Sequence, residues 1–255
     1  MKILVCIKQV PDMESKFKVA TNSIWYEDAD LAYRMNEYDE YAVEEAVRLK
    51  EKTGDADITV LSIGPERVKE AIKKALAMGC DRGVHVDDND YYKKEPYQKA
   101  AAIFEFAKDK NFDLIFTGLQ SQDTGNAQVG VLLGEMLGIP VVTTIVGFDY
   151  NGSEVTVKRE LEGGKKGVVK VKLPALFTCQ LGLNEPRYPT LPNIMKAKKK
   201  EIITISAQEL FKVQEQLEPV KMEYPEKKGG AVILEGDVGD LVNKVVQILK
   251  EKSFV

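Results

Sequence analysis

Small and amide-bearing residues gather in one run of the sequence, GLQSQDTGNAQVG at positions 118–130, between an expected strand and an expected helix. Such residues leave backbone N–H groups free, and the beginning of a helix favours anions because its N–H groups have no partner within the helix. A phosphate group could bind here, with Thr124, Asn126 and Gln128 as side-chain donors. A polar connecting loop with a helix cap explains the same residues, so the run alone leaves both interpretations open.

The sequence offers no assembled catalytic set. His85 is the one histidine, so neither a Ser–His–Asp triad nor a Cys–His pair can form without it. Cys6, Cys80 and Cys179 lie far apart without a CxxC pair, which favours buried apolar roles over a zinc or iron–sulfur site. No GxGxxG motif follows the first strand, and no Walker A sequence occurs. We therefore expect no metal site and no enzyme activity of the chain's own.

A second unusual segment, residues 183–200, reads LNEPRYPTLPNIMKAKKK. Its three prolines predict extended backbone, which lowers the entropy cost of presenting an apolar side chain to a partner. Leu191, Ile194 and Met195 are apolar residues in this mostly polar segment, and the lysines that follow could steer an encounter. A solvated surface also explains the lysine run.

Strands and helices are expected to alternate through the first two-thirds of the chain. The patterns predict strands at residues 2–10, 57–63, 83–86 and 113–117, and helices at 39–52, up to 78, at 97–110 and at 128–137. This alternation predicts an α/β fold with a Rossmann-like parallel sheet and helices on both faces. A ligand of such a sheet binds beyond the carboxyl ends of the strands, where the run 118–130 begins.

After Pro140 the pattern changes. Extended segments at 141–149, 154–160, 168–172 and 175–179 predict an antiparallel addition to the sheet. Apolar clusters are sparse from residue 184 until 231–234 and a helix at about 238–250. We therefore expect a domain of residues 1–200 and a C-terminal arm of residues 201–255, which needs a partner subunit to lie on.

Composition disfavours two classes of partner. The chain has 36 Lys and Arg against 40 Asp and Glu, a net charge of −4, and nucleic-acid binding needs clustered positive charge. No apolar stretch approaches the roughly 20 residues that cross a bilayer. Met1 and Lys2 lead directly into a short apolar strand, unlike a signal peptide. We expect a cytoplasmic protein of a prokaryote, without membrane insertion.

Several motifs resemble those of electron-transferring flavoprotein beta subunits. They are ILVCIKQVPD at 3–12, NEYD at 36–39 followed by AVEEA at 42–46, ALAMGCDRG at 75–83, the run 118–130, and NEPRY at 184–188 with the residues through Lys200. The resemblance covers residues 1–205 in order. It implies a Rossmann-like domain that joins an alpha subunit in a heterodimer, an electron carrier rather than an enzyme.

The resemblance also implies cofactors and their ligands. FAD would be held mainly by the alpha subunit, with residues 10–13 approaching its ring, and AMP without a redox role would be buried in this chain. The AMP site would comprise Cys6, Asn36, Glu37, Tyr38, Asp39, Ile63, Gly118, Gln120, Ser121, Gln122, Asp123, Thr124, Gly125, Asn126, Ala127, Gln128 and Val129. Many members have Gln-Ala-Ile-Asp where this chain has QSQD at 120–123. That difference leaves the details of nucleotide contact open.

Partners follow from the same resemblance. The segment with Leu191, Pro192, Ile194, Met195 and Lys196 would dock acyl-CoA dehydrogenase-type flavoenzymes, with Leu191 entering a hydrophobic pocket. Electrons would pass on to a quinone reductase or a similar acceptor. Some relatives bind a second FAD in place of AMP and bifurcate electrons. The TLPNIMKAKKK sequence at 190–200 favours AMP over this alternative. A third possibility, a stand-alone adenine-nucleotide-binding domain, would leave the C-terminal arm unexplained.

Overall fold

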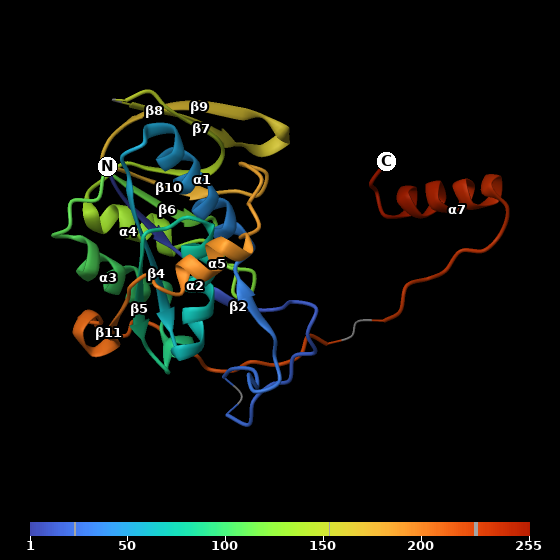
Figure 1. Cartoon of the computed structure of the whole chain (residues 1–255). Helices are drawn as coiled ribbons and strands as arrows, with labels where there is room; N and C mark the ends of the chain where they lie inside the picture. The colour runs from blue at the N-terminus through green and yellow to red at the C-terminus, as the bar shows by residue number, and fades with distance from the viewer. Residues whose placement is uncertain (23, 153, 227–228) are drawn as a thin grey trace. The chain divides into compact units, whose positions relative to one another are not determined.

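The computed structural model describes residues 1–22, 24–152, 154–226 and 229–255 (Figure 1). Two compact units are present, Met1–Met222 and Glu223–Val255, and each is described by itself. The first unit contains the α/β sheet and every strand among the described residues. The described residues of the second unit contain one helix.

Within the described residues, nine strands form one sheet in the order β11-β5-β4-β1-β6-β10-β7-β8-β9. The strands are β1 (Lys2–Cys6), β4 (Asp57–Gly64), β5 (Arg82–Asp87), β6 (Leu114–Gly118), β7 (Val141–Tyr150), β8 (Glu154–Glu160), β9 (Lys166–Lys172), β10 (Ala175–Cys179) and β11 (Ile202–Ser206). Pairing is parallel from β11 through β7 and antiparallel between β7, β8 and β9. Strand order reverses at β1, which has β4 on one side and β6 on the other.

Helices cover both faces of this sheet (Figure 1). They are α1 (Glu37–Thr53), α2 (Lys69–Met78), α3 (Pro96–Ala107), α4 (Val129–Leu137), α5 (Leu191–Ala197) and α6 (Ala207–Leu210). Successive residues of β1 face opposite sides, so Ile3 and Val5 join the core with α1 and α2, whereas Leu4 and Cys6 join the core with α3 and α4. The predicted Rossmann-like arrangement is confirmed.

Local sequence explains where these helices begin and end. Helix α1 has acidic residues in its first turn and Lys50 and Lys52 in its last, which suits the helix dipole. Its cap, Gly54, has φ 73°. Helix α4 ends in the same way at Gly138, with φ 65°. Glycine adopts this left-handed conformation without the steric cost that a Cβ brings.

Three expectations for the chain after Pro140 are corrected. Residues 175–179 do not belong to the antiparallel addition: β10 lies between β6 and β7 and is parallel to both. All five of its residues are buried, as in strands covered on both faces. Residues 202–206 form the edge strand β11, so the first unit extends beyond residue 200 to Met222. Residues 191–197 form helix α5 rather than extended backbone, because proline is tolerated in a first helical turn.

The amino-terminal strand is shorter than expected. Strand β1 ends at Cys6, and residues 9–11 form β2 (Gln9–Pro11) in a separate two-stranded antiparallel sheet with β3 (Tyr33–Met35). This small sheet places Asn36 directly before α1. All three cysteines are buried and free of disulfides, as predicted from their spacing.

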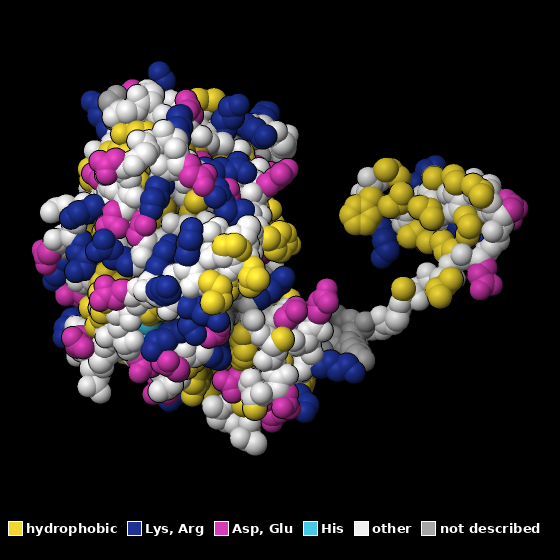
Figure 2. Space-filling view, in the orientation of Figure 1, with side chains coloured by type: hydrophobic (Ala, Val, Ile, Leu, Met, Phe, Trp, Pro, Cys, Tyr) yellow, Lys and Arg dark blue, Asp and Glu magenta, His cyan; other side chains and the backbone are white. Residues whose placement is uncertain are grey.

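The second unit carries α7 (Val238–Glu251), whose first turn is capped by the Asp237 side chain, an acceptor from the Gly239 and Asp240 N–H groups. Apolar side chains gather along this helix (Figure 2), and none of its residues is buried. The exposed apolar residues include Val238, Val242, Val245, Val246 and Ile248. Among the described helices, none has both the length and the apolar character needed to cross a membrane.

Candidate functional site

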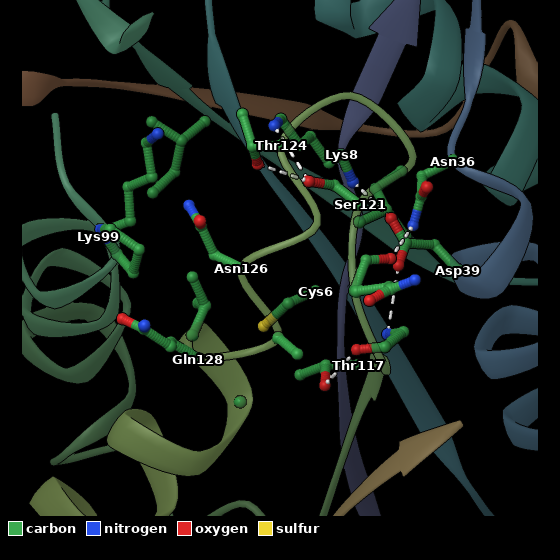
Figure 3. Close-up of a pocket in the computed structure, with 18 of the residues that line it drawn as sticks. Cys6, Lys8, Asn36, Asp39, Lys99, Thr117, Ser121, Thr124, Asn126 and Gln128 are labelled. Carbon is green, nitrogen blue, oxygen red and sulfur yellow. Dashed lines mark hydrogen bonds between the residues drawn. The ribbon is translucent and has the colours of Figure 1, made fainter. Parts of the chain in front are cut away.

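A hollow of about 850 Å³, its open mouth included, lies at the carboxyl ends of β1, β4 and β6. This is the point at which strand order reverses, where α/β sheets bind ligands. Its lining comes from β1 and the residues after it, the start of α1, β4, α3 and the loop from β6 to α4 (Figure 3). We call this hollow the β1–β6 cavity.

Asp39 joins three elements at the wall of the cavity. Its carboxylate accepts the Gly118 N–H at 3.0 Å and the Lys8 N–H at 2.7 Å, which ties the start of α1 to the ends of β6 and β1. Burial raises the pKa of the Asp39 carboxyl to about 7, although both hydrogen bonds act to lower it. A Cβ at Gly118 would collide with Asp39 and lie 2.8 Å from the Tyr38 Cβ. Gly118 therefore allows α1 to approach the strand end.

The residues around Asp39 fix the path of the loop after β6. Asn36 is almost fully buried, and its side chain donates to the Gln120 carbonyl at 2.8 Å and accepts the Gln122 N–H at 3.0 Å. Glu37 accepts from the Gln122 amide at 2.9 Å. The Tyr38 hydroxyl accepts from the Gln120 amide at 3.3 Å. Glu37, Tyr38 and Gln122 therefore support the loop without lining the cavity.

Lys8 and Asp123 form an ion pair at the edge of the cavity. The Lys8 Nζ donates to the Asp123 Oδ1 at 2.6 Å and to the Ser121 Oγ at 3.2 Å. Burial acts to raise the pKa of Asp123, but the Lys8 charge and hydrogen bond outweigh it, so this pKa is lowered. Ser121 also shares a hydrogen bond with Thr124 at 2.9 Å. The charge of Lys8 is thus already balanced within the protein.

Helix α4 begins at the cavity wall. Its first-turn N–H groups have no partner within the helix, and its dipole favours an anion there. Gly130 brings this turn close to β6, since an added Cβ would lie 2.6 Å from the Thr117 Oγ1. Asn126 and Gln128 project from the same stretch of chain (Figure 3). The arrangement suits a phosphate group.

Most of the residues predicted for the AMP site line the β1–β6 cavity. They are Cys6, Asn36, Asp39, Ile63, Gly118, Gln120, Ser121, Thr124, Asn126, Ala127, Gln128 and Val129. Glu37, Tyr38, Gln122, Asp123 and Gly125 lie outside the lining.

Sequence reasoning missed several lining residues, among them Lys8, Tyr91, Lys99 and Thr117. Lys8 and Thr117 follow or end strands already placed at the site, so the switch-point argument could have found them. Nothing in the pattern of α3 marked Lys99. Burial raises the pKa of the Cys6 thiol, so Cys6 is a neutral wall residue rather than a nucleophile.

Residues 184–200, which we call the docking segment, present an apolar surface elsewhere on the first unit. Leu191 is 73% exposed and Met195 54% exposed, on helix α5. Pro192, Ile194 and Lys196 are also exposed. Figure 2 shows apolar side chains gathered over α5, with basic side chains around them. Exposed apolar clusters of this kind mark contact surfaces.

Polar contacts fasten both ends of the docking segment. Arg187 pairs with Glu44 at 2.8 Å and with Glu51 at 2.6 Å, both on α1. The Asn184 amide donates to the Tyr41 carbonyl and to Glu45. At the other end the Lys200 ammonium donates to the Leu76 and Cys80 carbonyls, where α2 ends. Helix α5 is therefore held in place while its apolar residues stay exposed.

Comparisons with known proteins identify the family. Residues 24–210 match the electron transfer flavoprotein domain. The chain is 37% identical to the electron transfer flavoprotein subunit beta of Bacillus subtilis (strain 168), over 100% of both chains. It is 37% identical to that of Mus musculus, over 97% of this chain and 98% of the relative. It is 39% identical to that of Bradyrhizobium diazoefficiens, over 96% and 97%. The chain therefore belongs to the electron transfer flavoprotein beta subunit family.

Proposed function

We propose that this chain is the beta subunit of a heterodimeric electron-transferring flavoprotein that acts in the cytoplasm as an electron carrier, without substrate chemistry of its own. Family membership over the full length supports this proposal. FAD, held mainly by an alpha subunit, would supply the redox chemistry when bound. The second unit, residues 223–255, would pack on that subunit, a role supported by the unburied apolar side chains of α7.

The β1–β6 cavity carries the nucleotide part of the proposal. We assign it to AMP, with the phosphate at the start of α4 and the base toward the apolar wall that includes Leu61, Ile63 and Ile103. The lining supports this assignment, because Asn126, Gln128 and the first residues of α4 lie in the wall of the cavity and the start of a helix favours an anion. The nucleotide would have a structural role.

The exposed Leu191 supports the docking part of the proposal. A leucine held on a fastened helix loses little conformational entropy on binding, and its burial in a partner's pocket would contribute about 1.5–3 kcal/mol. We assign the partner as an acyl-CoA dehydrogenase-type flavoenzyme. Electrons would then leave the alpha-bound FAD for a quinone reductase or a similar acceptor.

Cofactor content tests the proposal. The complex that co-purifies with this chain is quantified for FAD and AMP per chain, and one of each is expected. Two FAD and no AMP would favour the alternative, an electron-bifurcating flavoprotein with a second FAD in the β1–β6 cavity. A chain that purifies alone, without flavin, would contradict both and favour a stand-alone adenine-nucleotide-binding domain.

A further inference from the structure

Lys99 is a cation without a counter-ion in the wall of the β1–β6 cavity. Among the residues that line the cavity, Lys8 and Lys99 carry the cationic side chains. Lys8 is engaged by Asp123 and Ser121. In the part of the chain that the structure describes, the Lys99 Nζ has neither a hydrogen-bond acceptor nor a carboxylate within ion-pair distance. Lys99 is partly buried, and a partly desolvated charge without a partner is costly.

The surroundings of Lys99 explain why its charge is poorly compensated. Burial, and to a smaller extent the nearby charge of Lys8, lower the pKa of Lys99 to about 8. Asp123, on the loop after β6, and Asp88, after β5, act in the opposite direction without contacting the ammonium, while Lys94 adds repulsion from the residues before α3. An anion entering the cavity would supply the missing counter-charge.

Lys99 lines the same cavity as the donors that suit a phosphate. Figure 3 shows Lys99 on α3 on the same side of the cavity as Asn126 and Gln128, with Asn36 and Asp39 on the opposite side. The start of α4 adds backbone N–H groups on that side. One side of the cavity therefore combines a free cation, side-chain amides and a helix N-terminus.

We propose that Lys99 binds the phosphate of a nucleoside 5′-monophosphate in the β1–β6 cavity and determines the preference for the nucleotide over the nucleoside. This inference rests on the proposed function, since it assigns the same cavity to a nucleotide. It goes beyond that function by naming the residue that neutralises the phosphate. Lys8 does not fill this role, because Asp123 already balances its charge.

Affinities for AMP and adenosine test the proposal. The complex that co-purifies with the chain is freed of bound nucleotide, and both ligands are titrated by calorimetry at pH 7. In Lys99→Met, AMP affinity should fall about 10- to 100-fold, as expected for loss of a charge-assisted hydrogen bond, while adenosine affinity stays within about twofold. Lys94→Met is the matched control, because the charge of Lys94 acts on Lys99 but Lys94 does not line the cavity. It should leave both affinities within about twofold.

A second variant separates charge from folding. Lys99→Arg keeps a cation whose pKa stays above the range tested. Wild-type affinity for AMP should fall as pH rises from about 7.5 to 9.5, since free Lys99 loses its proton in this range, and the arginine variant should lose this pH dependence. An unchanged AMP affinity in Lys99→Met, or equal losses for AMP and adenosine, would overturn the role of Lys99 alone. A wild-type complex that binds neither ligand would overturn the nucleotide site itself.

Discussion

The ion pairs between Arg187 and helix α1 lead to a quantitative prediction for Arg187→Met. The guanidinium donates to both Glu44 oxygens, at 2.8 and 3.0 Å, and to both Glu51 oxygens, at 2.6 and 2.9 Å. The Glu44 side chain is 3% exposed and that of Arg187 is 32% exposed. Methionine preserves the apolar stem of the side chain but removes the charge and every side-chain donor, while the backbone N–H of residue 187 still donates to Glu44.

The expected loss in unfolding free energy is about 2 kcal/mol. Removing one partner of a fully buried ion pair costs about 3–5 kcal/mol. Glu44 keeps a second partner, Arg48, at 2.8 Å, and Arg187 is partly hydrated, so the loss is smaller here. Glu51 is 57% exposed, and its pair contributes at most about 1 kcal/mol.

This loss should depend on pH. Burial acts to raise the pKa of Glu44, but the hydrogen bonds from Arg187 and Arg48 outweigh it and lower the pKa below the usual 4.5. A carboxyl whose pKa is lowered by folding stabilises the protein above its unfolded pKa, and this stabilisation disappears as pH falls through the folded pKa. Wild type and Arg187→Met should therefore converge in stability below about pH 4.

Urea unfolding at pH 7 and at acidic pH measures both effects, and hydrogen exchange of residues 184–200 reports whether the docking segment loosens. Lys52→Met is the matched control, because its pair with Asp149 is exposed on both sides and should contribute less than about 0.5 kcal/mol. A midpoint for Arg187→Met equal to that of wild type, with unchanged exchange in 184–200, would refute the reasoning.

Two further predictions concern docking and the site. Leu191→Ala should slow electron transfer from the dehydrogenase about 10- to 100-fold, as follows from losing a buried leucine, with FAD content unchanged. Leu217→Ala, also at an exposed leucine, is its control, and unaltered transfer kinetics in Leu191→Ala would contradict the docking role. Asp39→Asn should alter the pH dependence of stability, because folding raises the pKa of Asp39 to about 7. A carboxyl whose pKa is raised by folding loses its stabilising contribution as pH rises from about 4 to about 7. The wild-type advantage over Asp39→Asn should therefore shrink by up to about 1.4 kcal/mol per pH unit in that range, as measured by urea unfolding. An advantage independent of pH would rule this out.

Sequence reasoning was most successful where structure depends on local pattern. The alternation of strands and helices predicted the parallel sheet. The predicted helix end at residue 137 is also the end of α4, because the left-handed cap that Gly138 forms there is a local requirement. The polar run after β6 was expected at the carboxyl end of the sheet, and it does line the cavity there. Its position follows from the geometry shared by all parallel sheets.

The partners of individual strands and helices within the fold could be found only from the tertiary structure. The short apolar run 175–179 fits either kind of strand, and only its neighbours make β10 a central parallel strand. The prolines of residues 183–200 predicted extended chain, but residues 191–197 form helix α5, which packs against α2. The intrinsic conformational preference of a short segment stabilises it less than the burial of its apolar side chains against neighbouring elements.

The cavity shows the same division between sequence and tertiary structure. By itself, the sequence determined that amides, small residues and a helix start would meet at the end of β6, since these lie together along the chain. Only the tertiary structure brought Lys99 from α3 and Lys8 from the end of β1 to the same hollow. In the folded cavity Asp123 pairs with Lys8, whereas Lys99 has no counter-ion among the described residues. The physical reason is that burial and charge compensation depend on distances in space, which residues far apart in sequence acquire only on folding.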